Sequence, residues 1–428
     1  FTTAASAPSG VSYQWLKTGT PISGQPGPSS PTASPHLPDS PPYTAEASNS
    51  FGTATSQSAV LQVVETLPIP AFPGAEGPGS TASGGRGGEI YHVTNLSADR
   101  VTPPAGSLRY GLTQNVPPGG RTIVFDVGGT IRLLSSQVND ASSNIWLRCG
   151  ANNITVAGQT APYPGITIIN QGSKFTGDNV ILRNIAFRPG PDPKSPGNST
   201  NDGLSLQTKN SIIDHVSCGF MDDEGLSPTD AAVNTTVQYS IIAEGLNYEL
   251  SDGTHHAFGT LLSSEVANAP LSLHHNLYSD MTTRNPRIGN DGNGVTLGGA
   301  NEGSINNISN NVVYNWSGRA CYDAGSTRPA RANFLNNYFI AGPTTISTDR
   351  VYFGSGTNVR IHHSGNMVDM NKNGTVDGTA FNFTGPQFEG SIASMPTPFA
   401  VGSGYLQSAA DALQTVLNSA GTFWWNRT

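Results

Sequence analysis

The sequence predicts an all-β protein whose larger part is a right-handed parallel β-helix, and three observations support this fold class. Charged residues make up only 12% of the 428 residues, about half the share found in typical globular chains. Short apolar runs recur roughly every 25–35 residues, which is the spacing of a solenoid repeat. Asparagine stands near each run, and it tolerates the left-handed backbone conformation that a sharp corner requires.

Before this repeat, residues 1–66 are predicted to form a small β-sandwich. Strand-like alternation of apolar and polar residues occurs at residues 13–16, 43–47 and 59–63. The segment resembles an immunoglobulin-like module, in which Trp15 would be the core tryptophan and Tyr43 the corner tyrosine. Ala45 stands where the second core cysteine would be, so no core disulfide is expected. Residues 24–42 are too rich in proline and serine for regular central strands, so we expect an irregular spacer or packing module.

Residues 67–428 are predicted to form the β-helix domain, which begins with a linker at residues 67–70. Eight runs should stack as one sheet, at residues 154–156, 180–182, 211–213, 236–238, 271–273, 305–307, 332–334 and 359–361. Second strands are predicted at residues 185–187, 241–243 and 312–314. Amide bonds from coil to coil are expected at Asn153, Asn179, Asn210, Asn234, Asn276, Asn310, Asn337 and Asn366. Helical segments at residues 107–112 and 408–420 would cover the first coil and fold back on the outside.

Charge and cysteine content restrict the class of protein. A net charge of −8 excludes a general nucleic-acid surface, for which a basic stripe is expected. The sequence has no run of about 18 apolar residues, so no membrane span is predicted. Cys149, Cys218 and Cys321 show no CxxC spacing and are predicted to be buried free thiols; one disulfide plus one free thiol is the alternative. With Phe1 interpreted as a trimmed end, we expect a secreted monomer.

The first group of candidate site residues is acidic. Asp202 lies about one coil before Asp222, Asp223 and Glu224, so these carboxylates could meet on adjacent coils. Gathered carboxylates raise one another's pKa unless a cation lies among them, and Ca²⁺ prefers such oxygen ligands. The group therefore predicts a calcium site; the alternative is a set of solvated loop residues.

The second group is basic and consists of Arg284 and Arg287, three residues apart and two coils after the acids. Two such arginines are commonplace on a protein surface, but stacking of the coils could place Arg284 beside an anion held by the metal. An acidic protein repels a polyanion, and a bound cation together with arginines would reverse that repulsion locally.

A possible second metal site lies near the carboxyl end of the repeat. Asp369, Asn371, Asn373 and Asp377 alternate around Gly374 as in the first part of a calcium loop. Ala380 stands where such a loop has its closing glutamate, so an Asx-rich turn is the alternative interpretation.

From Ala71 onward the chain resembles the pectate lyases, a family of β-helical, pectin lyase-like polysaccharide lyases. The matching segments lie in order at residues 71–77, 84–88, 106–110, 156–162, 179–183, 213–215 and 284–287. The resemblance implies calcium-assisted β-elimination of polygalacturonate or pectin. It also implies that Asp202 and Asp223 bind Ca²⁺, that Arg284 removes the C5 proton and that Arg287 binds a substrate carboxylate. Because an arginine side chain has a reference pKa of about 12.5 or above, we expect an alkaline activity optimum.

Three positions depart from the family pattern. Ser227 stands where many members have a second acid after Asp223, and Thr200 stands where some have an acid before Asp202. No lysine occurs at residues 251–256, where a substrate-binding lysine is expected. Asp222 or Glu224 would then complete the calcium site, and His255 and His256 would take the place of the lysine unless they are structural.

Two rival functions are compatible with a β-helix. An inverting polygalacturonase would use Asp202 with Asp222 or Asp223 as acid and base and would need no metal, but the Gly-His-Gly and Arg-Ile-Lys motifs of that family are missing. A non-catalytic β-helical protein that binds acidic polysaccharide is favoured by the missing lysine and acid.

Overall fold

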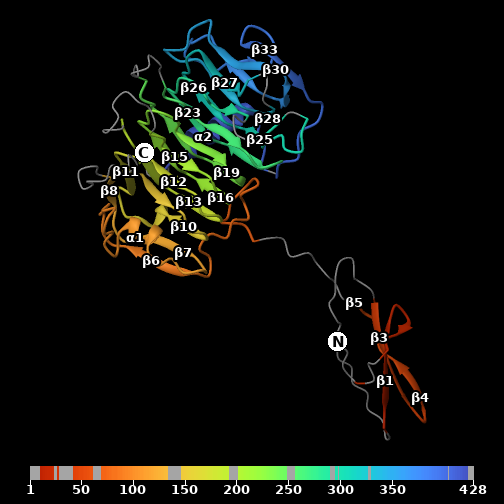
Figure 1. Ribbon diagram of the computed structural model, residues 1–428. Helices are drawn as coiled ribbons and strands as arrows, with labels where there is room; N and C mark the ends of the chain where they lie inside the picture. The colour runs from red at the N-terminus through yellow and green to blue at the C-terminus, as the bar shows by residue number, and fades with distance from the viewer. Residues whose placement is uncertain are drawn as a thin grey trace. The chain divides into compact units, whose positions relative to one another are not determined.

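The computed structural model divides the chain into two compact units, Phe1–Pro68 and Ile69–Thr428. Both are drawn in Figure 1. The structure describes residues 10–23, 27, 42–60, 69–133, 146–191, 201–247, 256–289, 295–296, 298–325, 329–402 and 404–422.

The first unit contains one antiparallel sheet. Its strands lie in the order β2, β1, β3, β4, with β5 also paired to β3; their bounds are β1 (Ser12–Lys17), β2 (Thr20–Pro21), β3 (Pro42–Asn49), β4 (Gly52–Thr55) and β5 (Ala59–Val60). Trp15 and Tyr43 are buried in it, as the pattern predicted. The described residues supply no second sheet, and residues 24–26, 28–41 and 61–68 lie outside them. The immunoglobulin-like sandwich therefore stays a prediction.

The second unit is a parallel β-helix, seen in Figure 1 as a stack of short arrows. One side is a sheet of ten strands: β8 (Gly129–Arg132), β11 (Ile166–Ile169), β14 (Ile185–Arg188), β17 (Ser217–Gly219), β20 (Ile241–Ala243), β23 (Leu277–Ser279), β26 (Val312–Tyr314), β29 (Tyr338–Ile340), β31 (Met367–Asp369) and β32 (Thr379–Ala380). Its neighbouring strands are parallel except for β31 and β32. The second strands predicted for each coil lie here, in β14, β20 and β26.

The other strands form an 18-stranded sheet made of two parallel series. One series is β6 (Glu89–Val93), β7 (Arg121–Phe125), β10 (Ile154–Ala157), β13 (Val180–Arg183), β16 (Lys209–Asp214), β19 (Val233–Gln238), β22 (Pro270–His274), β25 (Ile305–Ser309), β28 (Ala330–Leu335) and β30 (Arg350–Ser364). All eight predicted runs lie in this series, so this prediction is confirmed. The other series is β9 (Leu147–Cys149), β12 (Ser173–Phe175), β15 (Leu204–Leu206), β18 (Leu226–Asp230), β21 (Leu261–Ser264), β24 (Arg287–Ile288), β27 (Arg319–Asp323) and β33 (Phe388–Ser394).

Asparagines support the corners at two places. At the first, the same residues adopt the left-handed conformation and bond from coil to coil, whereas at the second these two functions fall to neighbouring residues. Asn153, Asn179 and Asn210 have φ values of 59°, 62° and 57° and also bond in a ladder, with Asn179 Nδ2 donating to Asn153 Oδ1 at 2.7 Å. On later coils the buried ladder is Asn276, Asn311, Asn337 and Asn366. There the left-handed residue is the one before the ladder amide, such as Asn310 or Asn336. Asn310 does bond to the next coil, because its Nδ2 donates to the Asn336 carbonyl at 3.2 Å, but the member of the buried ladder on this coil is Asn311.

Both predicted helices are present. Helix α1 (Leu108–Thr113) begins after Ser107, whose side chain accepts the N–H of Tyr110, and Leu108 and Leu112 join the apolar interior of the solenoid. Helix α2 (Ala409–Ser419) lies on the outside, where Leu413 and Val416 pack against Val312 and Tyr338. A short 3-10 turn, η1, spans Gly158–Thr160. No helix in the described ranges is long and apolar enough to cross a membrane.

The buried side chains follow the apolar pattern of the runs. The interior contains Phe175, Phe187, Phe334 and Trp316, each at most 2% exposed. Cys149, Cys218 and Cys321 are all buried and free, so the prediction of three buried thiols is confirmed.

Residues 71–88 run across the β-helix and bond to side chains of successive coils. The Glu76 and Gly79 amides donate to Gln238 Oε1 at 3.1 Å and to Thr236 Oγ1 at 2.9 Å. The Gly85 amide donates to Thr155 Oγ1 at 3.0 Å. This segment therefore links coils that are not adjacent and that the β-ladders connect only through the coils between them.

We predict that Gly79→Ala destabilises the protein. A Cβ on Gly79 would lie 2.0 Å from the Ser211 carbonyl oxygen, so the segment must move away from the sheet, at a cost of about 1–3 kcal/mol. The matched control is Gly119→Ala, whose Cβ would have its nearest neighbour at 3.9 Å. Thermal unfolding measures both variants, and an equal midpoint for the two would contradict the tight contact.

A second prediction concerns acid stability. His274 is 1% exposed, and burial, with a smaller effect of His275, lowers the pKa of His274 to about 3. Because an unfolded histidine has a pKa of about 6.5, below that pH the unfolded chain takes up a proton that the folded protein excludes. This group thus stabilises the fold above pH 6.5, and its contribution falls by about 1.4 kcal/mol per pH unit between about 6.5 and 3. Urea unfolding at several pH values should give His274→Asn a shallower acid decline than the wild type; parallel curves would contradict this.

Candidate active site

Three carboxylates from two neighbouring coils form the centre of the site. Asp202 lies just before β15, and Asp223 and Glu224 lie just before β18. These two coils are joined by the Gly203 amide, which donates to the Glu224 carbonyl at 2.8 Å. One oxygen from each of the three carboxylates lies within 4.8 Å of the others. The structure therefore brings three of the four predicted acids together, and we call Asp202, Asp223 and Glu224 the acid triad.

Burial and mutual repulsion make the charged forms of the acid triad less favourable. Burial raises the pKa of Asp202 well above its ordinary value, and the charges of Asp223 and Asp222 raise it further. Burial also raises the pKa of Asp223, although His256 and Arg284 act against it. Partly buried carboxylates this close are stabilised when a cation shares their oxygens.

The fourth predicted acid, Asp222, lies outside the triad. Its side chain is 1% exposed, and its Oδ1 accepts the backbone N–H of Asn201 at 2.9 Å. Asp222 and Glu224 were the two residues that could complete the predicted metal site. The structure places Glu224 with Asp202 and Asp223, while Asp222 supports the turn before β15.

Arg284 reaches the acid triad from a coil two steps along the solenoid. Its neighbour Thr283 pairs with Phe258, which in turn pairs with Glu224. The Arg284 guanidinium forms an ion pair with Glu224, its Nε donates to the Tyr322 hydroxyl at 3.1 Å, and its Cζ lies 3.8 Å from the centre of the Phe258 ring. The φ of Arg284 is 61°, a conformation that costs energy in a non-glycine residue and is often found at functional sites. Its contacts therefore aim the guanidinium at the acids.

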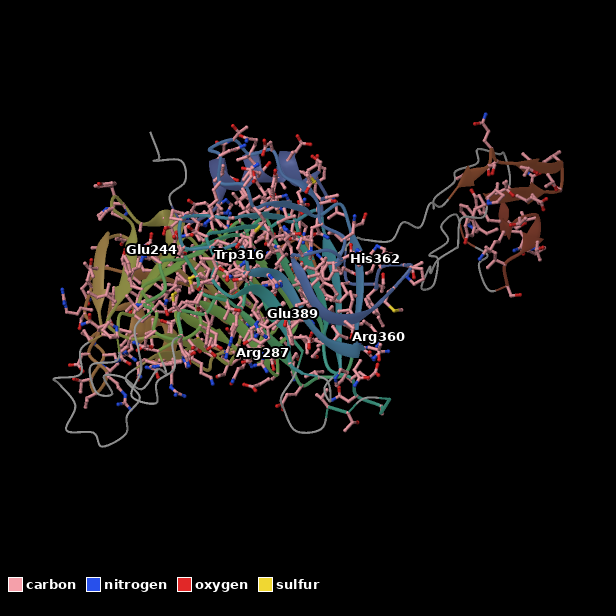
Figure 2. All side chains as sticks on the ribbon, turned by 90° about the horizontal axis from the view of Figure 1, so that it is seen from above. Glu244, Arg287, Trp316, Arg360, His362 and Glu389 are labelled. Carbon is pink, nitrogen blue, oxygen red and sulfur yellow. The ribbon has the colours of Figure 1, made fainter. Side chains whose placement is uncertain are left out.

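Arg287 belongs to a row of residues that lie in register from coil to coil and run along the solenoid beside the acid triad. Strand pairing places it between Leu261 and Tyr322, and its Cζ lies 5.7 Å from the centre of the Tyr322 ring. We call the full set the outer row: Lys174, Ser205, Ser227, Leu261, Arg287, Tyr322, Phe353 and Glu389. Figure 2 labels Arg287 and Glu389, two members of this row, on the β-helix unit.

Of the two histidines predicted to take the place of the missing lysine, only His256 lies in the described part of the chain. His256 stacks on Phe258 with ring centres 4.5 Å apart, and its Nδ1 lies 3.1 Å from Asp223 Oδ1. It is thus a partner of the acid triad, whereas His255 and Thr200 lie outside the described residues. Ser227, at the place of the missing acid, accepts the Leu261 amide at 3.0 Å.

Sequence reasoning missed Phe258, Tyr322 and Lys174. Phe258 and Tyr322 contact Arg284, and the charge of Lys174 acts on Asp202. Each follows or precedes a candidate site residue by about one coil, so an alignment of the coils by their asparagine corners could have found them.

The predicted second metal loop is closed by its own hydrogen bonds. The Asp369 carboxylate accepts the Asn371 and Asp377 amides at 3.2 Å each, and Asn371 Nδ2 donates to Asp377 Oδ1 at 2.6 Å. Asn373 Oδ1 accepts the Thr375 amide at 2.8 Å. These contacts are those of the Asx-rich turn, and the calcium function of the loop stays a prediction.

Comparisons with known proteins agree on one family, although no family model matches the chain. "Probable pectate lyase C" of Aspergillus fumigatus is 36% identical over 370 residues, which are 86% of this chain and 76% of the relative. Its counterpart in Aspergillus flavus is 35% identical over 76% of this chain and 67% of the relative. Among solved structures, jun a 1, the major allergen from cedar pollen, has a TM-score of 0.57 at 16% identity and covers 81% of this chain and 92% of its own. A pectate lyase bound to a hexasaccharide has a TM-score of 0.53 at 15% identity, covering 83% and 98%.

The solved structures establish the fold, which is the parallel β-helix of polysaccharide lyases, and the curated relatives establish the kinship. The chain belongs to the pectate lyase family. The protein is therefore an enzyme of the polysaccharide lyase class, and its acid triad is a group that could bind a metal ion.

Proposed function

We propose that this pectate lyase cleaves α-1,4-linked polygalacturonate by β-elimination at the acid triad and Arg284, giving 4,5-unsaturated products. The observation that carries the proposal is the contact between Glu224 and Arg284. It joins the group that could hold a cation to the arginine that the family resemblance implies as the base.

The acid triad has the chemistry of a calcium site. It offers only oxygen ligands, which Ca²⁺ prefers, and burial raises the pKa of Asp202 and Asp223, a cost of ionisation that a bound cation would offset. Bound there, Ca²⁺ would neutralise the carboxylate of the substrate and stabilise negative charge that develops at C5. We assign the ligands as Asp202, Asp223 and Glu224, and we leave Asp222 to support the turn.

Each of three residues near the acid triad would then have a separate role in the reaction. Arg284 takes the C5 proton with its guanidinium, which Phe258 and Tyr322 hold in place. Arg287 binds the carboxylate of a neighbouring uronate, because a guanidinium pairs well with carboxylates. His256 orients Asp223 through the contact at 3.1 Å.

Glu224 must leave Arg284 before the arginine can accept a proton. A carboxylate beside a guanidinium favours its charged form, and a base must be neutral when it takes up the proton. Glu224 lies close enough to both Arg284 and the two aspartates that it could release the arginine and join the aspartates in binding a cation. In this proposal the ion pair is thus a resting arrangement of the site.

The geometry disfavours an inverting hydrolase that would use Asp202 and Asp223 as its acid and base. Such enzymes hold two carboxyl groups about 6.5–9.5 Å apart to admit a water molecule, whereas the acid triad has oxygens within 4.8 Å of one another. Membership of the pectate lyase family disfavours a non-catalytic binding protein, and the product assay tests that alternative directly. We further propose that the protein is a secreted monomer, that its partner is an acidic polysaccharide, and that it binds neither nucleic acid nor membranes.

The first prediction of this proposal concerns the base. On polygalacturonate at alkaline pH with Ca²⁺, the wild type should generate the ultraviolet absorbance of an unsaturated uronate. Arg284→Ala should lower kcat by about 10²–10⁴-fold, as expected for loss of a general base. Arg132→Ala, an exposed arginine on β8, should remain active. New reducing ends without absorbance would instead indicate hydrolysis, and the absence of both signals would favour the binding protein.

The second prediction concerns the metal. Calorimetric titration with CaCl₂ should show binding that Asp223→Asn weakens by at least about tenfold, because a carboxylate ligand is lost. Asp222→Asn is the matched control, since its Oδ1 can still accept the Asn201 amide and lies outside the triad. Equal loss in both variants would contradict the assignment. A second binding event that only Asp377→Asn removes would establish the loop at residues 369–377 as a calcium site.

A further inference from the structure

Three arginines lie around Tyr322, and they are not confined to the acid triad. Arg284 donates to the Tyr322 hydroxyl at 3.1 Å, and Arg287 lies over the ring with its Cζ 5.7 Å from the centre. A third arginine, Arg319 of β27, has its Cζ 5.6 Å from the same ring and 4.4 Å from the Phe353 ring. Tyr322 therefore has three guanidinium groups around it in a protein whose net charge is −8.

Arg319 differs from the arginine that follows it along the solenoid. Arg319 and Arg350 pair in register on neighbouring strands. Arg350 Nε lies 3.7 Å from Glu389 Oε2, whereas in the described part of the chain no ion pair joins Arg319 to an acid. The Arg319 side chain is exposed. Its contacts are instead the faces of Tyr322 and Phe353, which orient the guanidinium and leave its N–H groups available.

We propose that Arg319, on the platform of Tyr322 and Phe353, binds the carboxylate of a uronate residue one or two sugars away from the cleaved bond. This inference rests on the proposed function and adds a further substrate-binding residue to it. Strand β27 is one coil beyond β24, which follows Arg284. A polymer that lies along the outer row with one sugar at the acid triad would pass Arg287 and then reach Arg319.

The chemical consequence is a preference for runs of free uronate beyond the cleaved bond. A guanidinium pairs strongly with a carboxylate and weakly with its neutral methyl ester. Arg350 contributes little, because Glu389 already neutralises it.

The test compares Arg319→Gln with the matched control Arg350→Gln. Affinity for polygalacturonate is measured in an inactive Arg284→Ala background, and KM is measured in the active enzyme. Arg319→Gln should weaken binding and raise KM by about tenfold, the effect of losing one charge-assisted contact. Arg350→Gln should change both by less than about twofold, as for an exposed ion pair. With fully methyl-esterified polymer, the effect of Arg319→Gln on binding should vanish.

The outcomes separate this inference from the proposed function. Unchanged affinity and KM in Arg319→Gln, in an enzyme that forms unsaturated product, would overturn the inference and leave the function standing. Weaker binding by Arg319→Gln to polygalacturonate but not to the ester, in a protein that forms no unsaturated product, would support the inference and overturn the elimination reaction. Equal losses in the two glutamine variants would show a general charge effect and would also overturn the inference.

Discussion

The register between coils is the constraint on which this structure depends. Each strand of the solenoid bonds to the strands one coil before and one coil after it, so residues about one coil apart must lie side by side. The asparagine corners keep that register, because their amides bond from one coil to the next. Residues 71–88 strengthen it by bonding across several coils. The acid triad exists because this register places Asp202 beside Glu224.

The site resolves the conflict between an acidic protein and a polyanionic substrate by arranging charge in two zones. The acid triad concentrates negative charge where a cation would bind. The arginines around Tyr322 supply positive charge on the following coils. Net charge therefore says little about what this surface attracts, because potentials near a surface depend on local groups.

The sequence was most informative where the physics is local and periodic. All eight predicted runs fall in one series of strands, and both helices begin after serines that cap them. It was less reliable at consecutive residues of the same type. Asn310 and Asn311 are residues of the same type, yet only Asn311 joins the buried ladder. Asp222 and Asp223 are likewise alike in sequence, but one supports a turn and the other belongs to the triad.

The sequence by itself determined the solenoid, its family and the stretch of chain that carries the chemistry, because repeat spacing, corner residues and ordered motifs are properties of the chain. Only the tertiary structure decided which carboxylates converge, and that Phe258 and Tyr322 hold Arg284. The physical reason is that the turns between strands vary in length, so side-chain direction follows from how each turn packs on its neighbours. Spacing alone predicts which coils are adjacent, whereas contact between side chains depends on the packing of the turns.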